Sequence, residues 1–174
     1  MKKVNRIVTD RLVLQSLRDK DRDDMVDILK SEVNKTYMIP DLHNKDEEDK
    51  LFSRLKKVSE MDDHFAYGIF LDDKIIGYLN DVEKTEEEIE IGYFISPSCW
   101  GHGYASEAFK GAIDVLFSLG YKHVYAGFFV GNIASEGVMQ KCGLKKIDKT
   151  EEIEYRGISR SVMYYRIDKD ERRI

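Results

Sequence analysis

Cysteine and proline are both scarce in this chain of 174 residues, which contains two of each. The two cysteines, Cys99 and Cys142, follow neither a CxxC spacing nor a Cys/His spacing typical of a metal site. We therefore expect a reduced, cytoplasmic protein with no metal site. The low proline content and the absence of any low-complexity segment indicate a regularly structured chain without a disordered linker.

Long hydrophobic runs are also missing. No apolar run approaches the roughly 20 residues needed to span a bilayer. The start of the chain lacks the continuous apolar segment of a secretory signal. The formal net charge of −5 argues against nucleic acid or an anionic membrane as a partner, and it is compatible with a basic amine. At 174 residues, 42% of them hydrophobic, the chain is predicted to form a single domain over residues 1–174.

The hydrophobic periodicity predicts an α+β fold, with a mixed, mostly antiparallel sheet of about seven strands and four or so helices. Three successive strands around short turns predict an antiparallel meander, and the strand after the main helix is expected to lie parallel to the strand before it. The expected elements are, in order, a strand at 11–17, a helix from Asp19, a helix at about 51–58, strands at 65–71, 75–79 and 89–95, a helix from about 104, a strand at 123–130, a helix from 132, and strands at 144–153 and 159–167.

The most informative stretch runs from Ile89 to Ala108. An alternating apolar strand is stopped by Pro97, two glycines follow at 101 and 103, and an amphipathic helix begins at about Tyr104. A glycine-rich turn between a strand and a helix leaves backbone N–H groups bare at the positive end of the helix. The pattern therefore predicts a site for an anionic group such as a pyrophosphate.

Two familiar nucleotide-binding patterns fit this turn poorly. The Rossmann fingerprint requires a third glycine, whose place is taken by Ser106, and it follows the first strand of a repeated βαβ array rather than a meander. The P-loop requires a Gly-Lys-Ser/Thr sequence, which is absent here. Nucleotide binding through the glycine turn remains a minor alternative.

The segment Trp100-Gly-His-Gly-Tyr-Ala105 resembles the Gln/Arg-x-x-Gly-x-Gly/Ala pyrophosphate loop of the GNAT superfamily of acyl-CoA-dependent N-acyltransferases, with Trp100 in place of the usual Gln or Arg. This Trp and Glu90-Ile-Gly-Tyr93 are similar to the branch that contains ribosomal-protein N-terminal acetyltransferases. Thr9-Asp-Arg-Leu-Val-Leu14, Asn132-Ile-Ala-Ser135 and Lys141-Cys-Gly-Leu144 resemble further elements of that branch in the expected order.

The resemblance implies acetyl-CoA as co-substrate. A splay between the strands at 89–95 and 123–130 would offer edge groups to the pantetheine arm, and amides of the glycine turn would hold the pyrophosphate. The implied cofactor-binding residues are Phe94, Ile95, Trp100, Gly101, His102, Gly103, Tyr104, Ala105, Ser106, Asn132 and Ser135. An alternative role for Asn132 is simple capping of the helix that it begins.

Acetyl transfer from a thioester to an amine needs a base for the amine and, optionally, an acid for the departing thiolate. Glu90 is the first candidate base because a carboxylate on an apolar central strand is costly unless it is used or paired. Pairing with Lys or Arg, or exposure at the strand's start, is the alternative for Glu90, and Glu88 is the second candidate. Many members place a Tyr acid where this chain has Met139, so the resemblance implies that Ser135 acts instead.

The acceptor is left open by the sequence. The resemblance implies that the N-terminal helices and the final hairpin recognise it, which implicates roughly residues 32–41 and 155–159, including Tyr37 and Arg156. Glu88 is a further candidate for binding the acceptor. Protein N-termini and small-molecule amines both fit as partners, and the chain is expected to be a monomer or a homodimer. The leading hypothesis is an acetyl-CoA-dependent N-acetyltransferase, and the alternative from another class is a non-catalytic acyl-CoA-binding module.

Overall fold

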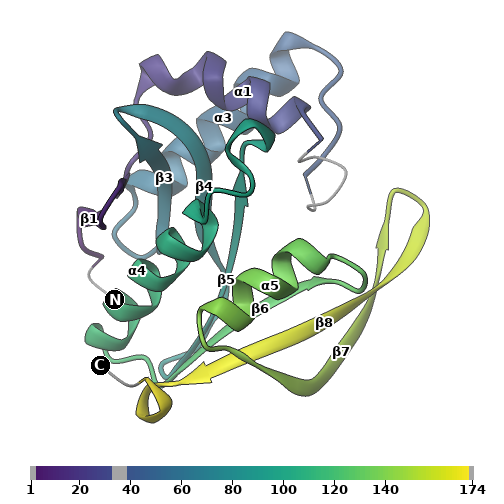
Figure 1. Ribbon diagram of the computed structural model, residues 1–174. Coiled ribbons are helices and arrows are strands. Elements are labelled where there is room, and N and C mark those ends of the chain that lie inside the picture. Colours follow the sequence, from purple (N-terminus) through teal and green to yellow (C-terminus); the bar gives the residue numbers. More distant parts are fainter. Residues whose placement is uncertain (1–2, 33–38, 173–174) are drawn as a thin grey trace.

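The computed structural model describes residues 3–32 and 39–172, which build one eight-stranded sheet with helices on both faces (Figure 1). The strands are β1 (Arg6–Val8), β2 (Leu12–Gln15), β3 (Ala66–Leu71), β4 (Lys74–Lys84), β5 (Glu88–Ile95), β6 (His123–Phe129), β7 (Lys145–Tyr155) and β8 (Ile158–Asp168). The α-helices of the described residues are α1 (Arg22–Lys30), α3 (Lys45–Glu60), α4 (Tyr104–Ser118) and α5 (Ile133–Lys141).

The strand order across the sheet is β1-β2-β3-β4-β5-β6-β8-β7. All neighbouring strands are antiparallel except β5 and β6, which are parallel and are connected through α4. This parallel pair is registered from Glu88 with His123 only as far as Glu90 with Tyr125, although β5 continues to Ile95 and β6 to Phe129. The sheet therefore opens between the second halves of β5 and β6 (Figure 1).

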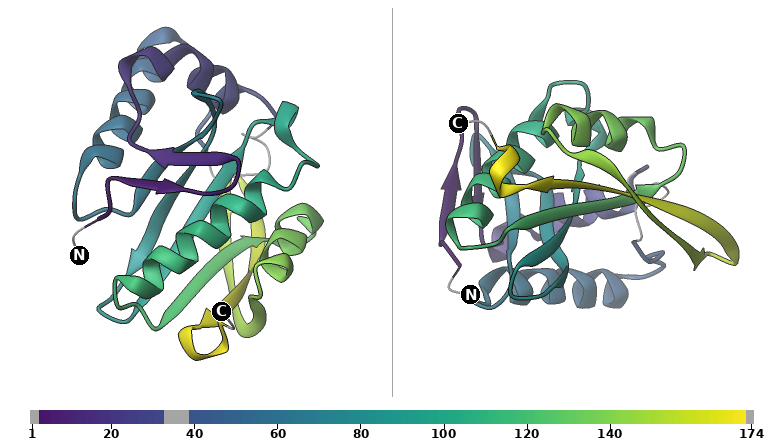
Figure 2. Two further views of the ribbon diagram at one scale, coloured as in Figure 1. Left: turned by 60° about the vertical axis from the view of Figure 1, so that its left-hand side comes forward. Right: turned by 90° about the horizontal axis from the view of Figure 1, so that it is seen from below.

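Two large hydrophobic clusters form most of the core, one on each face of the sheet, and a small third cluster contains Phe129, Val162 and Tyr164 of β6 and β8. Residues of α4 and α5 pack with β2, β5 and β6 in the first cluster, while α1 and α3 pack against β3 and β4 in the second. Figure 2 shows α4 and α5 on one side of the strands and α3 on the other. The stripe of α4 that the sequence predicts faces the core, with Ala112 and Leu116 both fully buried.

The structure confirms the α+β class, the meander and the parallel crossover, and it corrects the N-terminal strands. The strand expected at 11–17 spans only 12–15, and it is preceded by β1, which the sequence analysis missed. Only Ile7 of β1 is buried, so three residues carry too little hydrophobic pattern to predict an edge strand. The described sheet accordingly has eight strands where about seven were expected.

No helix within residues 3–32 and 39–172 is long and apolar enough to cross a membrane.

Candidate active site

The glycine turn has the geometry that its sequence predicts. Gly101 and Gly103 adopt positive φ angles of 78° and 81°, a region in which side chains are strained. Gly103 is the N-cap of α4 and supplies no side chain to cap the helix. Among the described residues, no hydrogen bond takes up the backbone N–H groups of Gly103 through Ser106. Bare amides at the positive end of a long helix have the geometry that favours binding of an anion.

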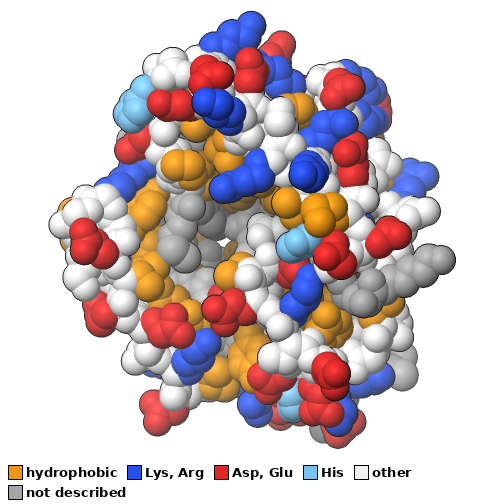
Figure 3. All heavy atoms as spheres, turned by 180° about the vertical axis from the view of Figure 1, so that it is seen from behind, with side chains coloured by type: hydrophobic (Ala, Val, Ile, Leu, Met, Phe, Trp, Pro, Cys, Tyr) orange, Lys and Arg blue, Asp and Glu red, His pale blue; other side chains and the backbone are white. Residues whose placement is uncertain are grey.

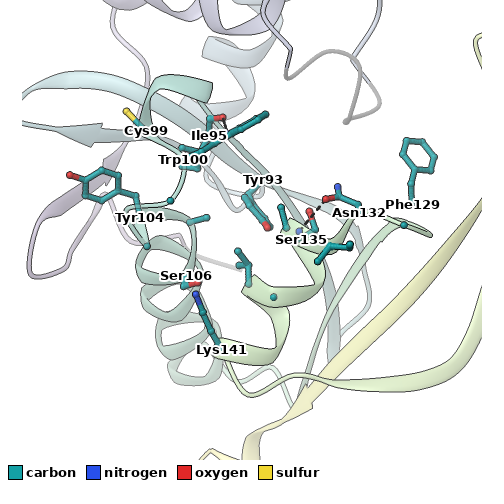
Figure 4. Close-up of a pocket in the computed structure, with 18 of the residues that line it drawn as sticks. Tyr93, Ile95, Cys99, Trp100, Tyr104, Ser106, Phe129, Asn132, Ser135 and Lys141 are labelled. Carbon is teal, nitrogen blue, oxygen red and sulfur yellow. Dashed lines mark hydrogen bonds between the residues drawn. The ribbon is translucent and has the colours of Figure 1, made fainter.

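A cavity of about 800 Å³ lies between this turn and the N-terminal end of α5. It occupies the region where β5 and β6 have separated, because its wall includes Tyr93 and Ile95 of β5 and Phe129 of β6. We call it the cofactor cavity. Figure 4 shows side chains of the strands, α4 and α5 converging on it. The other sequence-predicted residues in its wall are Trp100, Gly101, Gly103, Tyr104, Ala105, Ser106, Asn132 and Ser135.

The side chains of two predicted cofactor-binding residues, Phe94 and His102, point elsewhere, whereas the prediction concerned their backbone groups. Phe94 does not line the cofactor cavity but stacks on Tyr78 on the opposite face of the sheet, because successive strand residues alternate between faces. The side chain of His102 is also absent from the wall. Its ring stacks on Tyr104, and its Nδ1 lies 2.8 Å from the carbonyl oxygen of Trp100.

The indole of Trp100 occupies one of the backbone groups of Ile95 that the sequence analysis expected to be free for a pantetheine arm. Trp100 Nε1 donates to the carbonyl oxygen of Ile95 at 2.8 Å, so this carbonyl is already bonded. A short 3₁₀ turn at Pro97–Cys99 reverses the chain and returns Trp100 to the end of β5. The side chain of Ile95 still lines the cavity.

The N-terminus of α5 is ordered by its own cap. Asn132 Oδ1 accepts a hydrogen bond of 3.1 Å from the backbone N–H of Ser135, which is the capping alternative considered for Asn132 (Figure 4). Ser135 is buried, with an exposure of 3%. In Figure 4 the side chains of Tyr93, Asn132 and Ser135 gather at one end of the cavity.

A second cavity of about 340 Å³ meets the first at this point, and we call it the acceptor cavity. Tyr93, Phe129, Asn132 and Ser135 belong to the walls of both cavities. The wall of the acceptor cavity is mainly apolar, with side chains from α1, α3 and the sheet. Figure 3, which views the molecule from behind, shows a hollow with hydrophobic side chains along part of its rim.

Glu90 is the acidic residue in the wall of the acceptor cavity. Burial raises its pKa to about 7, an effect that the positive charge of Lys149 partly opposes. Its carboxylate has room because residue 127 is glycine: a Cβ there would lie 3.2 Å from Oε1 of Glu90. Glu90 is therefore half protonated near neutral pH, which is the range in which a general base is effective.

Two of the predicted acceptor-binding residues, Glu88 and Arg156, lie outside the walls of both cavities. Glu88 is not in either cavity wall, and it accepts a hydrogen bond of 2.9 Å from the hydroxyl of Tyr125. Arg156, at the tip of the β7–β8 hairpin, forms an ion pair of 2.5 Å with Asp41. Tyr37 lies outside the described residues.

Sequence reasoning missed several residues of the two cavities. Lys141 and Arg160 add positive charge to the wall of the cofactor cavity, and Tyr164 lies in the acceptor cavity. Lys141 stands in a motif that the sequence analysis had quoted, but Arg160 and Tyr164 had no local signal because β8 reaches the site only through long-range pairing with β6.

Within residues 3–32 and 39–172, no group of three or more His, Cys, Asp or Glu side chains is placed to hold a metal ion.

Comparison with known proteins identifies the family. A profile of the Acetyltransferase (GNAT) domain matches residues 11–145, which is well over half of the chain. The chain is also 26% identical over 162 residues to the uncharacterized N-acetyltransferase YoaA of Bacillus subtilis (strain 168), an alignment that covers 90% of this chain and 86% of that protein.

Solved structures share the fold. A probable GNAT-family acetyltransferase from Chromobacterium violaceum superimposes with a TM-score of 0.83 and 18% identity, covering 98% of this chain and 90% of that chain. RimL, a ribosomal alpha-N-protein acetyltransferase solved in complex with coenzyme A, gives a TM-score of 0.81 and 16% identity, covering 96% of this chain and 99% of that chain.

Proposed function

The chain belongs to the acetyltransferase (GNAT) family, and we propose that it transfers an acetyl group from acetyl-CoA to a primary amine by direct attack in a ternary complex. One observation carries this proposal. The cofactor cavity and the acceptor cavity are lined largely by different residues but share Tyr93, Phe129, Asn132 and Ser135. A donor and an acceptor that enter from the two sides would bring their reacting atoms together at that junction.

The cofactor cavity suits acetyl-CoA in its chemistry. The bare amides from Gly103 to Ser106 would hold the pyrophosphate. Beside Gly101 there is open space, because no described atom beyond its two sequence neighbours lies within 4 Å of the position that a Cβ would take. Lys141 and Arg160 supply further positive charge in the same wall. The separated strands β5 and β6 would accommodate the pantetheine arm, and RimL, which shares this fold, was solved with coenzyme A.

In this proposal Glu90 is the general base. The amine nitrogen attacks the thioester carbonyl carbon, the C–S bond breaks, and Glu90 accepts the proton that the nitrogen loses. An α-amine with a pKa of about 7.7–8.0 is about 10–20% neutral at pH 7, whereas a lysine amine is only about 0.04% neutral. A carboxylate with a pKa of about 7 is a weak base, so it suits an α-amine better than a lysine side chain.

Ser135 is proposed to donate a hydrogen bond or a proton to the departing thiolate. The cap from Asn132 fixes the start of α5 and therefore the position of Ser135 at the junction of the two cavities. The position where many family members carry a Tyr acid is Met139, which is buried in the core at 1% exposure and has no proton to give. Because a thiol with a pKa of about 8.5 leaves easily, a weak acid is sufficient.

The acceptor is proposed to be an amine with an apolar neighbouring group. The wall that surrounds Glu90 includes Leu29, Leu51, Tyr78 and Phe128, which favour burial of a hydrophobic substituent. An N-terminal α-amine of a peptide that begins with an apolar residue fits this description, and so does a small hydrophobic amine.

The test begins with thermal-shift titrations of acetyl-CoA, CoA, NAD and ATP. Ligand at about 100 times its Kd adds roughly 2.7 kcal/mol to the free energy of unfolding, so a shift with acetyl-CoA and CoA alone is expected. A shift with NAD or ATP and none with either CoA compound would refute the proposal.

Acetyl transfer to a panel of peptides and small amines is then followed through the release of the CoA thiol. Glu90→Gln is expected to lower kcat/KM about 100-fold, within the usual range for loss of a general base. Glu88→Gln is the matched control, because Glu88 lies two positions away on the same strand and outside both cavities. Tight CoA binding without turnover across the panel would instead assign a non-catalytic acyl-CoA-binding module.

A further inference from the structure

The segment around Arg11 meets the glycine turn although more than 90 positions separate them in the sequence. Arg11 lies in the turn between β1 and β2, and Glu107 lies in the first turn of α4. The backbone N–H of Arg11 donates to Glu107 Oε1 at 2.7 Å, and its Nε donates to Glu107 Oε2 at 2.7 Å. Thr9 adds a hydrogen bond of 2.6 Å from its hydroxyl to Glu107 Oε1.

The other edge of the same guanidinium holds the glycine turn. Arg11 Nη1 donates to the carbonyl oxygen of His102 at 3.1 Å. The guanidinium carbon lies 4.5 Å from the centroid of the Tyr104 ring, a cation–π distance. Arg11 Nη2 would lie 3.6 Å from a Cβ on Gly103, so the side chain crosses directly over the turn. Arg11 therefore fixes both the turn and the first residue of α4.

Glu107 creates an electrostatic conflict that Arg11 resolves. An acidic residue in the first turn of a helix interacts favourably with the helix dipole. The same negative charge opposes any anion that binds the bare amides of Gly103 to Ser106. Burial alone would raise the pKa of Glu107, but hydrogen bonds from Thr9 and Arg11 hold it below its ordinary value, so the carboxylate is ionised. Its charge is then balanced by the guanidinium that contacts it.

We propose that Arg11 is a positioning residue for the pyrophosphate of the cofactor. It cancels the charge of Glu107 and holds the backbone from His102 to Tyr104 in the conformation that presents its amides to the anion. The inference rests on the proposed function, since it concerns the same cofactor cavity. It also gives a role to Thr9-Asp-Arg-Leu-Val-Leu14, which the catalytic steps leave unused.

The test compares two acyl donors that differ in the pyrophosphate. Arg11→Met keeps an apolar stem over Tyr104 but removes the charge and the hydrogen bonds. With acetyl-CoA its kcat/KM is expected to fall about tenfold, as for the loss of a charge-assisted hydrogen bond, with kcat at saturation unchanged. With acetyl-pantetheine, which lacks the pyrophosphate, kcat/KM is expected to stay within about twofold of the original protein. Arg6→Met, an exposed arginine on β1, is the matched control.

A second variant separates the two effects of Arg11. If charge cancellation dominates, Arg11→Met with Glu107→Gln recovers part of the loss; if support of the turn dominates, the double variant stays as weak as Arg11→Met. Equal losses with both donors, or no loss with acetyl-CoA, would overturn the proposal. Should Arg11→Met fail to fold, Arg11→Lys keeps the charge, and its donor-selective loss replaces the first comparison.

A separate result tests the proposed acetyltransferase function itself. If the original protein neither binds CoA nor uses acetyl-CoA, the proposed function falls whatever the Arg11 variants do.

Discussion

Glu90 and Gly127 face each other across β5 and β6 at the point where the two strands separate. A Cβ at residue 127 would lie 3.2 Å from Glu90 Oε1 and 2.7 Å from Cε1 of Tyr164. Registered pairing of the strands ends at Glu90 and Tyr125. The absence of a side chain at Gly127 therefore gives the carboxylate its place in the acceptor cavity.

Gly127→Ala is expected to displace Tyr164 and Glu90, because 2.7 Å is shorter than real Cβ contacts. Overpacking of this kind typically costs about 1–3 kcal/mol of the free energy of unfolding. We expect kcat/KM for the amine to fall about tenfold, while the Kd for CoA stays within about twofold, because the cofactor cavity is not touched. Steady-state kinetics and CoA titration measure both. An equal loss of CoA affinity would show that the effect is not local.

The buried carboxyl of Glu90 also makes stability depend on pH. Its pKa is about 7 in the folded protein and ordinarily 4.5. Below about pH 4.5 both states are protonated and Glu90 carries no penalty. Between pH 4.5 and 7 the folded state retains a proton that the unfolded state has lost, so the free energy of unfolding falls as the pH rises through this range.

Glu90→Gln removes that decline. Relative to the original protein, the variant is expected to gain about 1–2 kcal/mol in the free energy of unfolding at pH 8, a figure discounted for the partial exposure of Glu90. The gain should disappear near pH 4.5. Urea unfolding at a series of pH values measures it. A difference that is constant with pH would show that the pKa of Glu90 is not raised.

The sequence and the structure agree best where a feature is formed by residues that are contiguous in the sequence. The glycine turn, its helix and the preceding strand are contiguous, so the conformation of the turn at Gly101–Gly103 and the start of α4 could be predicted from spacing alone. Features that depend on contacts between distant segments could not be predicted from the sequence. The bond from Trp100 to the carbonyl of Ile95 and the ion pair between Arg11 and Glu107 both require the folded backbone.

The alternation along β5 correctly predicts that Glu90 and Ile91 lie on opposite faces of the sheet. It could not predict which of the carboxylates on the face of Glu90 lies in a cavity. Glu88 shares the face of Glu90 in the pattern, yet it lies where β5 and β6 are still paired and its carboxylate bonds to Tyr125. Only the end of pairing, a property of three-dimensional strand geometry, separates the two carboxylates. Arg160 and Tyr164 were missed for a related reason, because β8 joins the site through its pairing with β6.

The activity should depend on pH through the same carboxyl. As a base Glu90 acts only when ionised, so kcat/KM for an α-amine substrate is expected to rise with pH through an apparent pKa of about 7 and then through that of the amine. In Glu90→Gln the lower limb should be lost, which leaves the ionisation of the amine at about 7.7–8.0. A profile that keeps the limb near 7 in this variant would assign it to another group.

The tip of the β7–β8 hairpin is tied to the segment that follows α1. The hydroxyl of Tyr155 donates to the carbonyl oxygen of Ile39 at 2.8 Å, and Arg156 pairs with Asp41 at 2.5 Å. Ile39 and Pro40 belong to the wall of the acceptor cavity, whereas neither belongs to that of the cofactor cavity. The tie therefore holds one wall of the acceptor cavity in place.

Tyr155→Phe with Arg156→Ala releases this tie while it keeps the aromatic ring beside Phe129. We expect KM for the amine to rise about fivefold, because a looser wall must be ordered when the amine binds. The KM for acetyl-CoA should not change. Stability should fall by no more than about 1–2 kcal/mol, because the ion pair is half exposed and a hydrogen bond such as that from Tyr155 to Ile39 contributes about 1 kcal/mol. An increase in both KM values would mean that the hairpin supports the whole site, and no change in either would mean that the acceptor does not contact this wall.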